Sequence, residues 1–331
     1  MIEMLNKVNV IEKNKVFINS FRSFFSNEGY IEENAKEITS RFDKSVYFIG
    51  SAISVLKPYF LENKIPSKGV FLIQPAIRTR NLSNIYEESE LPEWSSYFKA
   101  LGILVKYENL EDICRDIWNF FNKEVGIKKE NFLVRGFSED KDLLKYWIRE
   151  KDNIPNIEIN SMPINYYRHK YGLSSQGIFG RNINLALRSS TRADFKDIGN
   201  IIVIESADKK YGVEAAFGVS NTISKIMGYK SSLEVDLFAN LQTYHDIADY
   251  KFADCITTIT HLMHENLKMN ASNSEGRLLR KYLQALLFWS GKLGVSVDKI
   301  CELVKEYERL EYEYCKIRDD QLKGYLKKLI K

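Results

Sequence analysis

The stretch GVFLIQPAIRTRNLSNIYEESELPEWSSYFKALGILVKY, residues 69 to 107, decides the fold. Its apolar run Val70–Ile73 predicts a strand that leads to Arg78, and a second apolar run follows after a polar loop. An arginine delivered by a strand suits a carboxylate or a phosphate, because its planar fork donates two parallel hydrogen bonds and keeps its charge. From these residues alone, a surface ion pair explains Arg78 equally well.

Length and composition set the class of protein. With 331 residues, the chain exceeds one compact core, which favours a large domain and a smaller one. No segment is apolar enough to span a bilayer, and the N-terminal residues lack the pattern of a secretory signal, so we expect a cytoplasmic protein without membrane contact. The formal net charge of +4 neither requires nor excludes a nucleic acid partner.

Metal binding is not expected. The four cysteines lie far apart and form no CxxC pair, which argues against a zinc site and a disulfide framework. His261, His264 and Glu265 form an HxxHE pattern, which lacks the i, i+4 histidine spacing of zinc proteases.

Apolar periodicity predicts alternating helices and strands. Amphipathic spacing indicates helices, several of which end at a glycine, and short apolar runs indicate buried strands. The expected helices cover residues 16–30, 110–126 and 140–150, with one or two more over 296–331, and the expected strands include 132–136 and 201–204.

The order of four segments resembles the second signature motif of the alanyl-tRNA synthetase family, whose catalytic domain is of class II. The segments are QPAIRT (74–79), NLSNI (81–85), YFKALG (97–102) and WNFFNKEVGI (118–127). Further similarity extends from about Phe17 to about Gly294. The resemblance implies an α+β fold with an antiparallel sheet flanked by helices, followed by a small helical domain.

The resemblance also divides the chain and implies an assembly. Residues 1–230 correspond to the class II catalytic domain, and residues 231–331 correspond to the start of the tRNA-recognition domain. Residues 43–52, expected to form a strand and a helix start, resemble the first motif, which builds a homodimer interface in class II enzymes.

Several site residues follow from the resemblance. Arg78 takes the place of the arginine that holds the α-phosphate of ATP and the carboxylate of the amino acid. Asn200, in the stretch 194–205, takes the place of an asparagine that holds the amino acid, although a strand-end asparagine that satisfies a turn is an equal alternative. Glu214 corresponds to the acidic group that receives the ammonium group. Tyr167 precedes a flexible run and is a further candidate for amino-acid binding.

The sequence departs from the family pattern on the nucleotide side. The phenylalanine that stacks on adenine is absent, and Tyr107 is a possible replacement. The family's metal-binding glutamate is replaced by Asn182 or Asn184. No arginine occurs between Arg192 and Arg277, so Asn221 or a neighbour takes the place of the γ-phosphate arginine. The resemblance implies ATP and Mg²⁺ as cofactors, whereas these departures argue against both.

The segment 272–281 resembles the family's contact with the tRNA acceptor stem. Asn273, Arg277 and Arg280 are therefore candidates for RNA contact, and a helix cap with basic residues on its solvated face is the alternative.

Two functions follow from the resemblance and its departures. The first is activation or transfer of a small amino acid, alanine or a relative, to a tRNA or a small-molecule acceptor. The second is a synthetase paralog without ATP-dependent activation, which acts as a binding or regulatory module or uses pre-charged alanyl-tRNA.

Overall fold

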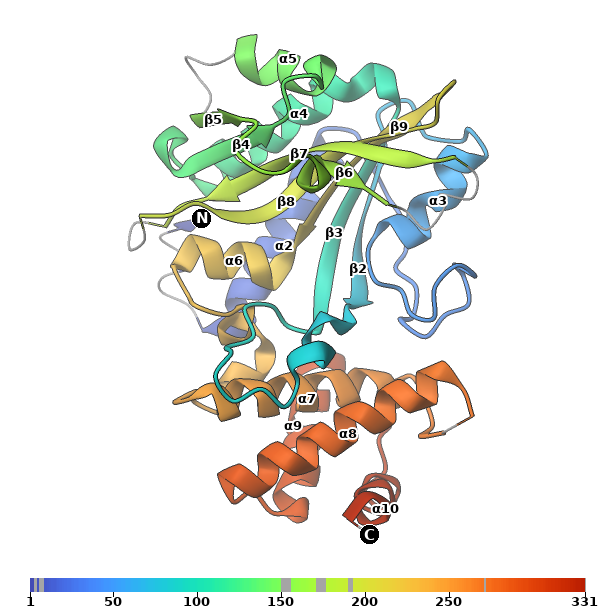
Figure 1. The fold of residues 1–331 in the computed structure, drawn as a ribbon, viewed down its shortest axis with the longest axis vertical. Coiled ribbons are helices and arrows are strands. Elements are labelled where there is room, and N and C mark those ends of the chain that lie inside the picture. The colour runs from blue at the N-terminus through green and yellow to red at the C-terminus, as the bar shows by residue number, and fades with distance from the viewer. Residues whose placement is uncertain are drawn as a thin grey trace.

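The computed structural model describes residues 1–2, 5, 9–149, 156–170, 177–189, 193–270 and 272–330. A mostly antiparallel sheet with helices on both faces occupies one end of the molecule, and a group of helices occupies the other end (Figure 1). The α+β architecture expected from the sequence is confirmed. Within the described residues, no helix combines the length and apolar character that a membrane crossing requires.

The strands are β1 (Ile31–Glu32), β2 (Val70–Ile77), β3 (Tyr97–Val105), β4 (Phe132–Gly136), β5 (Asn156–Ile159), β6 (Arg168–His169), β7 (Phe179–Leu187), β8 (Lys196–Glu205) and β9 (Lys210–Gly218). The helices are α2 (Val10–Asn27), α3 (Ile53–Leu61), α4 (Leu110–Asn119), α5 (Lys141–Arg149), α6 (Val219–Met227), α7 (Ile247–His264), α8 (Ser274–Leu293), α9 (Val297–Tyr312) and α10 (Asp319–Ile330).

The sheet has the order β1-β2-β3-β9-β8-β7-β4-β5, and β6 pairs with β7. The central pairs from β2 to β4 are all antiparallel, whereas β1 with β2 and β4 with β5 are parallel. Central strands hydrogen-bonded on both sides give the rigid platform on which a site is held accurately.

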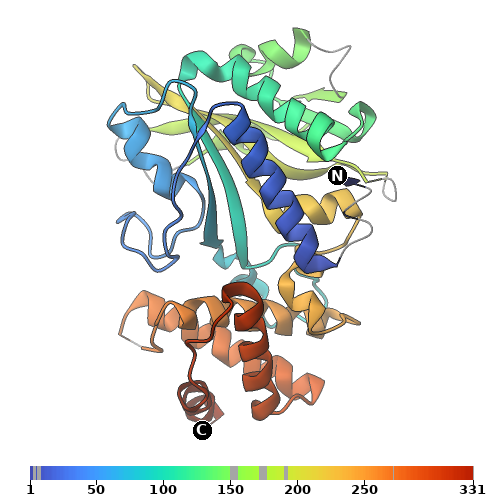
Figure 2. The same ribbon diagram turned by 180° about the vertical axis from the view of Figure 1, so that it is seen from behind.

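Helices α2 and α4 cover the back face of the sheet (Figure 2). Phe17, Phe21 and Phe25 recur on one side of α2 and are fully buried, in edge and tilted contacts with Phe71 and Phe120. The main hydrophobic core therefore lies behind the sheet, which leaves part of the front face free for a site.

The front face is partly covered by α3. At Gly102 on β3, a β carbon would lie 2.2 Å from the β carbon of Ala52, just before α3 begins. Only glycine permits this close approach of helix and sheet.

We expect Gly102→Ala to lower the free energy of unfolding by about 1–3 kcal/mol, because the added methyl group overpacks this contact. Urea unfolding followed by circular dichroism measures the loss. Gly291→Ala on α8 is the control, since its β carbon meets no atom within 4 Å, and we expect it to raise stability slightly. A neutral Gly102→Ala would contradict the packing account.

The strand expected within residues 43–52 is not formed, and this expectation was wrong. Asp43 accepts hydrogen bonds from the backbone and hydroxyl of Ser45 and lies 2.6 Å from the Lys57 ammonium. An aspartate that bonds the backbone two residues on stabilises a turn, so this segment turns before α3 begins. The expected helix 110–126 is confirmed as α4, which continues as a π-helix over Phe120–Val125 and ends at Gly126.

Helices α7 to α10 form one hydrophobic cluster with the end of the sheet. The cluster includes Ile77 at the end of β2, Ile85 in the loop that follows β2, and Tyr97 at the start of β3. Tyr282 and Trp289 of α8 belong to the same cluster. The helical segment therefore packs directly on the strands that carry Arg78. A division of the chain at residue 230 stays a prediction.

Asp236, between two 3-10 turns at this junction, is only 8% exposed. Burial raises its pKa to about 7, and Glu311 adds to the effect while the Phe238 N–H opposes it. Between the unfolded value of 3.8 and about 7, the unfolded chain loses a proton that the folded chain keeps, so this carboxyl lowers stability as the pH rises.

Asp236→Asn removes that penalty. We expect the variant to gain stability over the wild type by roughly 1.4 kcal/mol for each pH unit between pH 4 and pH 7, and to keep the gain above pH 7. Urea unfolding of both proteins across this range tests it. A difference that does not vary with pH would contradict the buried, protonated carboxyl.

Candidate functional site

Strand register decides which side chains share the open front face. Leu104, Glu214 and Ile202 are neighbours across β3, β9 and β8, and Gly102, Ala216 and Asn200 form the next row. Alternate residues Val105, Val213 and Val203 belong to the core behind the sheet.

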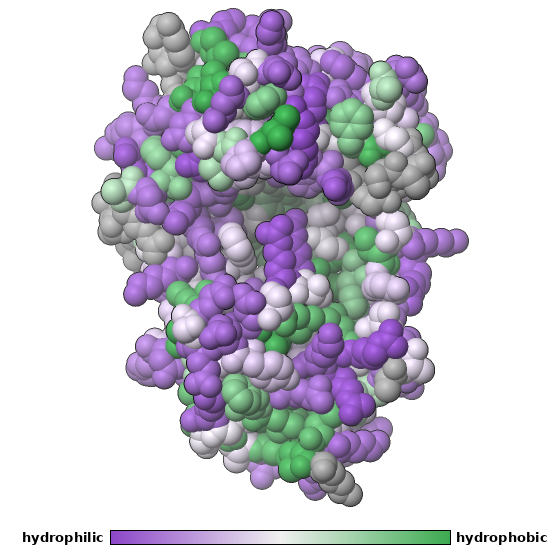
Figure 3. Space-filling model, in the orientation of Figure 1, coloured by the Kyte–Doolittle hydropathy of each residue, from purple (hydrophilic) through white to green (hydrophobic). Residues whose placement is uncertain are grey.

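The front face is open beyond the part that α3 covers. Ala216, Gly218 and Asn200 lie on central strands yet are partly exposed. The same face is hollowed over the middle of the sheet (Figure 3). This hollow is the candidate site.

Arg78 follows the last residue of β2 on this side. Its backbone N–H donates to the Ser96 carbonyl at 2.9 Å, its Nε donates to the Gly50 carbonyl at 3.1 Å, and its guanidinium lies 5.1 Å from the Phe98 ring. Its two terminal nitrogens make no hydrogen bond within the described part of the chain. The fork is therefore held at its base and is available to an anionic ligand.

The charges around Arg78 suit a small zwitterion. Burial and the neighbouring Arg80 lower the pKa of Arg78, and the negative charge of Glu214 opposes this. Glu214 is only 2% exposed. Burial, Arg78 and Arg80 also lower the pKa of His169 on β6, which favours its neutral form. The site thus has positive charge from Arg78 and Arg80 on one side, and the buried carboxylate of Glu214 lies beside it.

Asparagines line the strands next to Glu214. Asn184 and Asn200 are direct neighbours across β7 and β8. Asn182 donates to the Asn184 side-chain oxygen at 2.8 Å and to the Tyr166 carbonyl at 3.2 Å. The Asn182 oxygen and the Tyr167 hydroxyl are buried without a hydrogen-bond partner among the described residues. Buried polar atoms are nearly always paired, so these atoms indicate a bound water or ligand.

Asn221 lies in the first turn of α6, directly after the end of β9. A β carbon on Gly218 would contact both Asn221 and Phe98. The Asn221 amide donates to the Asp197 carbonyl at 3.2 Å, and its oxygen has no partner among the described residues. The structure therefore brings Asn221 to the Arg78 side of the site.

Tyr107 lies on the other side of the sheet. It packs against the core behind the sheet, its hydroxyl donates to Asp142 at 2.9 Å, and the Lys210 ammonium lies over its ring. The structure does not bring Tyr107 together with Arg78, because β3 ends at Val105 and the chain turns to the back face.

The RNA candidates lie at the start of α8, away from the sheet. The Asn273 side-chain oxygen caps α8 by accepting from the Gly276 N–H at 2.7 Å. Arg277 and Arg280 are exposed, three residues apart on one face of the helix. The geometry fits the helix-cap alternative for Asn273 and leaves both arginines accessible.

The described residues contain no ready-made cluster of metal ligands. Within the described ranges, no three His, Cys, Asp or Glu side chains cluster in a way that would hold a metal ion. Asp197, the other carboxylate near the front asparagines, is bonded to Arg135 at 2.7 Å and to the Tyr166 hydroxyl. His261 and His264 are buried in contacts with tyrosines and Glu308. The run Tyr171–Gln176 lies outside the described residues.

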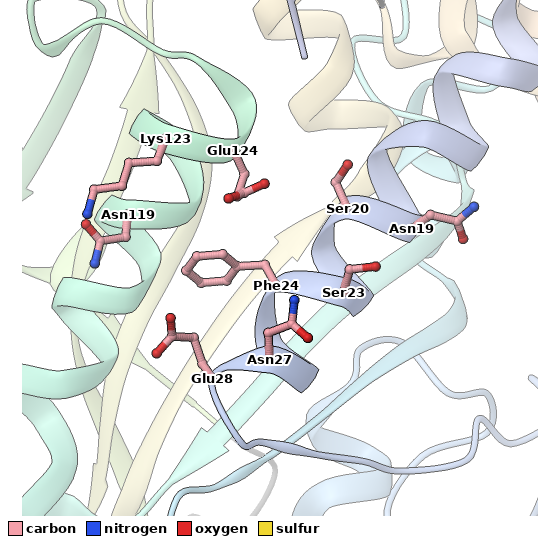
Figure 4. Close-up of a pocket in the computed structure, with 9 residues that line it drawn as sticks. All are labelled: Asn19, Ser20, Ser23, Phe24, Asn27, Glu28, Asn119, Lys123 and Glu124. Carbon is pink, nitrogen blue, oxygen red and sulfur yellow. The ribbon is translucent and has the colours of Figure 1, made fainter.

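A groove of about 470 Å³ lies on the opposite side of the molecule, between α2 and the helix that follows α4 (Figure 4). Serines, asparagines and solvent-facing charges line it around Phe24. It contains none of the residues expected to bind a ligand, and we do not assign it to the site.

Comparison with known proteins finds distant relatives of this chain. The alanine–tRNA ligase 1 of Lachnoclostridium phytofermentans is 21% identical over 86% of this chain and 36% of the ligase. The chain is a distant homologue of alanine–tRNA ligases. The ligase from Acetivibrio thermocellus is 24% identical over 46% of this chain and 17% of the ligase, and that from Thermoanaerobacter sp. (strain X514) is 28% identical over 38% of this chain and 14% of the ligase. No family model matches.

This chain spans about a third of the length of the first of these relatives. Among solved structures, the aspartyl-tRNA synthetase of Entamoeba histolytica overlays with a TM-score of 0.42 and 11% identity, covering 68% of this chain and 57% of that chain. The asparaginyl-tRNA synthetase of Pyrococcus horikoshii, complexed with asparaginyl-adenylate, has a TM-score of 0.42 and 9% identity, covering 68% and 67%.

Proposed function

We propose that this chain binds a small α-amino acid, alanine or a relative, on the front face of the sheet and passes its acyl group to an acceptor. One observation carries the proposal: the front face of the sheet presents the buried carboxylate of Glu214, and at the end of β2 on the same side the guanidinium of Arg78, whose terminal nitrogens have no hydrogen-bond partner among the described residues. Arg78 would bind the carboxylate through its free fork, and Glu214 the ammonium group. Asn200 lies in the row next to Glu214 and offers an amide donor and acceptor.

The acyl transfer would depend mainly on positioning. An acceptor hydroxyl or amine attacks the carbonyl carbon of the activated amino acid, the leaving group departs, and the acceptor proton passes to a base. Neutral His169 fits this last role, because burial and then the positive charges of Arg78 and Arg80 lower its pKa. Arg78 would stabilise the negative charge that develops on the carbonyl oxygen or on the leaving group.

The acceptor is a tRNA or a small molecule. The exposed Arg277 and Arg280 support a contact with the phosphates of an acceptor stem. If that contact exists, the affinity for RNA falls steeply with salt, because bound phosphates release their counterions. A homodimer through the segment before α3 remains an expectation from the resemblance.

A second function is favoured by the departures from the family pattern on the nucleotide side. In this alternative, the chain does not activate the amino acid with ATP, and it binds an already activated donor such as an alanyl ester of tRNA or acts as a regulatory module. Asn221 in the place of a charged phosphate clamp supports it, since hydrogen bonds between charged groups are the strong ones.

Calorimetric titration with L-alanine, and then with ATP and Mg²⁺, separates the two functions. Alanine binding with alanine-dependent pyrophosphate exchange supports activation by ATP. Alanine binding without exchange supports the activated-donor alternative. If alanine, glycine and serine all fail to bind, the amino-acid site is wrong.

A further inference from the structure

We infer that Asp254 on α7 is a positioning residue for Arg78, so that the helical segment forms part of the amino-acid site. The inference rests on the proposed function, in which Arg78 binds the carboxylate. Asp254 lies 176 positions after Arg78 and is only 3% exposed. It acts on both chain segments that flank Arg78 in space.

The first segment is the start of β3. One carboxylate oxygen of Asp254 accepts the Ser96 backbone N–H at 2.6 Å, and the other accepts the Ser96 hydroxyl at 2.7 Å. The Ser96 carbonyl in turn accepts the Arg78 N–H at 2.9 Å. Asp254 therefore fixes the peptide that holds the backbone of Arg78.

The second segment is the 3-10 turn Thr79–Asn84, which begins directly after Arg78. Asn81 in this turn donates to Asp254 at 2.9 Å and to the Trp94 carbonyl at 2.7 Å. Lys251, one turn earlier on α7, donates to the Asn84 carbonyl at 2.5 Å. Helix α7 therefore holds the turn after Arg78 at two points.

A carboxylate at this place is costly unless it is fully hydrogen-bonded. Asp254 meets that condition with three hydrogen bonds, and Tyr282 of α8 completes the group by donating to the Ser96 hydroxyl at 2.9 Å. All four of these bonds join a side chain of α7 or α8 to Ser96 or Asn81, which lie on the two segments that flank Arg78. The network is thus directed at the geometry of that loop.

The consequence for ligand binding is specific. A bidentate contact with a carboxylate depends on the direction of the guanidinium fork, and a small displacement weakens both hydrogen bonds. Loss of Asp254 should therefore lower the affinity for ligands with a carboxylate and leave the affinity for ligands without one unchanged. A general structural defect would weaken both classes.

Asp254→Asn tests the inference. The variant replaces one carboxylate oxygen by an NH2 group, which cannot accept the hydrogen bonds that Asn81 and Ser96 donate to Asp254. Calorimetry with L-alanine and with alaninol, which lacks the carboxylate, should give about a 10-fold loss for alanine and less than a twofold change for alaninol. Asp236→Asn is the control, because it removes another buried carboxylate at the same junction that does not contact Ser96 or Asn81. For this control, the ratio of the dissociation constants for alanine and alaninol should equal that of the wild type. An unchanged ratio in a folded Asp254→Asn protein overturns the inference.

Amide hydrogen exchange gives a measurement that needs no ligand. Asp254→Asn should raise the exchange rate of the Arg78 N–H at least 10-fold over the wild type, whereas Asp236→Asn should not. If Asp254→Asn and the wild type exchange the Arg78 N–H at equal rates, the positioning role is overturned even if alanine binds. If the rate is raised but alanine does not bind, the positioning role holds and the proposed function fails. If Asp254→Asn does not fold, Asn81→Ala removes the bonds of the turn to Asp254 and to the Trp94 carbonyl, leaves both Ser96 bonds to Asp254 in place, and should raise the exchange rate of the Arg78 N–H.

Discussion

Arg78→Ala is expected to lower the affinity for L-alanine at least about 100-fold, because two charge-assisted hydrogen bonds to the carboxylate are lost together. The fold should remain intact, since the Arg78 side chain makes one hydrogen bond, to the Gly50 carbonyl, within the described structure. Calorimetric titration measures the affinity, and circular dichroism checks the fold.

Arg80→Ala is the matched control for this prediction. Arg80 influences the pKa of Arg78 and His169 through its charge. We expect a loss of affinity below about 10-fold for this variant, because only a partly screened attraction is removed. Equal losses in the two variants would mean that Arg78 contributes charge and no directed contact.

Glu308→Ala is expected to lower the free energy of unfolding by about 3–5 kcal/mol, the largest loss of stability among these variants. Glu308 on α9 is fully buried, lies 2.6 Å from His264 Nδ1 and accepts the backbone N–H groups of Lys316 and Ile317. Its removal leaves the Ile317 N–H and the His264 ring nitrogen, both in buried residues, and the partly buried Lys316 N–H without this acceptor. Urea unfolding at neutral pH measures the loss.

Glu302→Ala on the same helix is the control for Glu308. Glu302 is exposed and pairs with Lys299 three residues earlier. Exposed pairs of this kind contribute little, so we expect a change below about 0.5 kcal/mol. If the two variants lose the same stability, the loss reflects a change in helix propensity and not the buried contacts.

The sequence predicted the elements well because their apolar periodicity is strong. The run before Arg78 became β2, and Phe17, Phe21 and Phe25 mark one face of α2, as their spacing indicates. The strand expected within residues 43–52 failed because Asp43 bonds Ser45 locally, and a local polar contact outweighed a short apolar run.

The site was predictable in part. Resemblance and chemistry pointed to Arg78, Glu214 and Asn200, but only strand register shows that Glu214 and Asn200 share a face. Tyr107 was an expectation that register does not support, since the chain crosses to the back of the sheet after Val105. The contact of Asp254 with Ser96 joins residues 158 positions apart, and no local pattern signals such a pair.

The start of β3 serves two neighbours at once. Tyr97 stacks on His261 and Lys99 pairs with Glu311, both in the helical segment, while Phe98 between them faces Arg78. Because successive residues of a strand point to opposite faces, one short segment is shared by the sheet and the helices. The two halves of the chain are therefore not interchangeable modules. Removing the helices would expose the Tyr97 and Lys99 side of this strand and would remove the contacts that fix the position of its ligand-facing side. Selection acting on a ligand at Arg78 would then also constrain residues of α7 and α9 that never meet it.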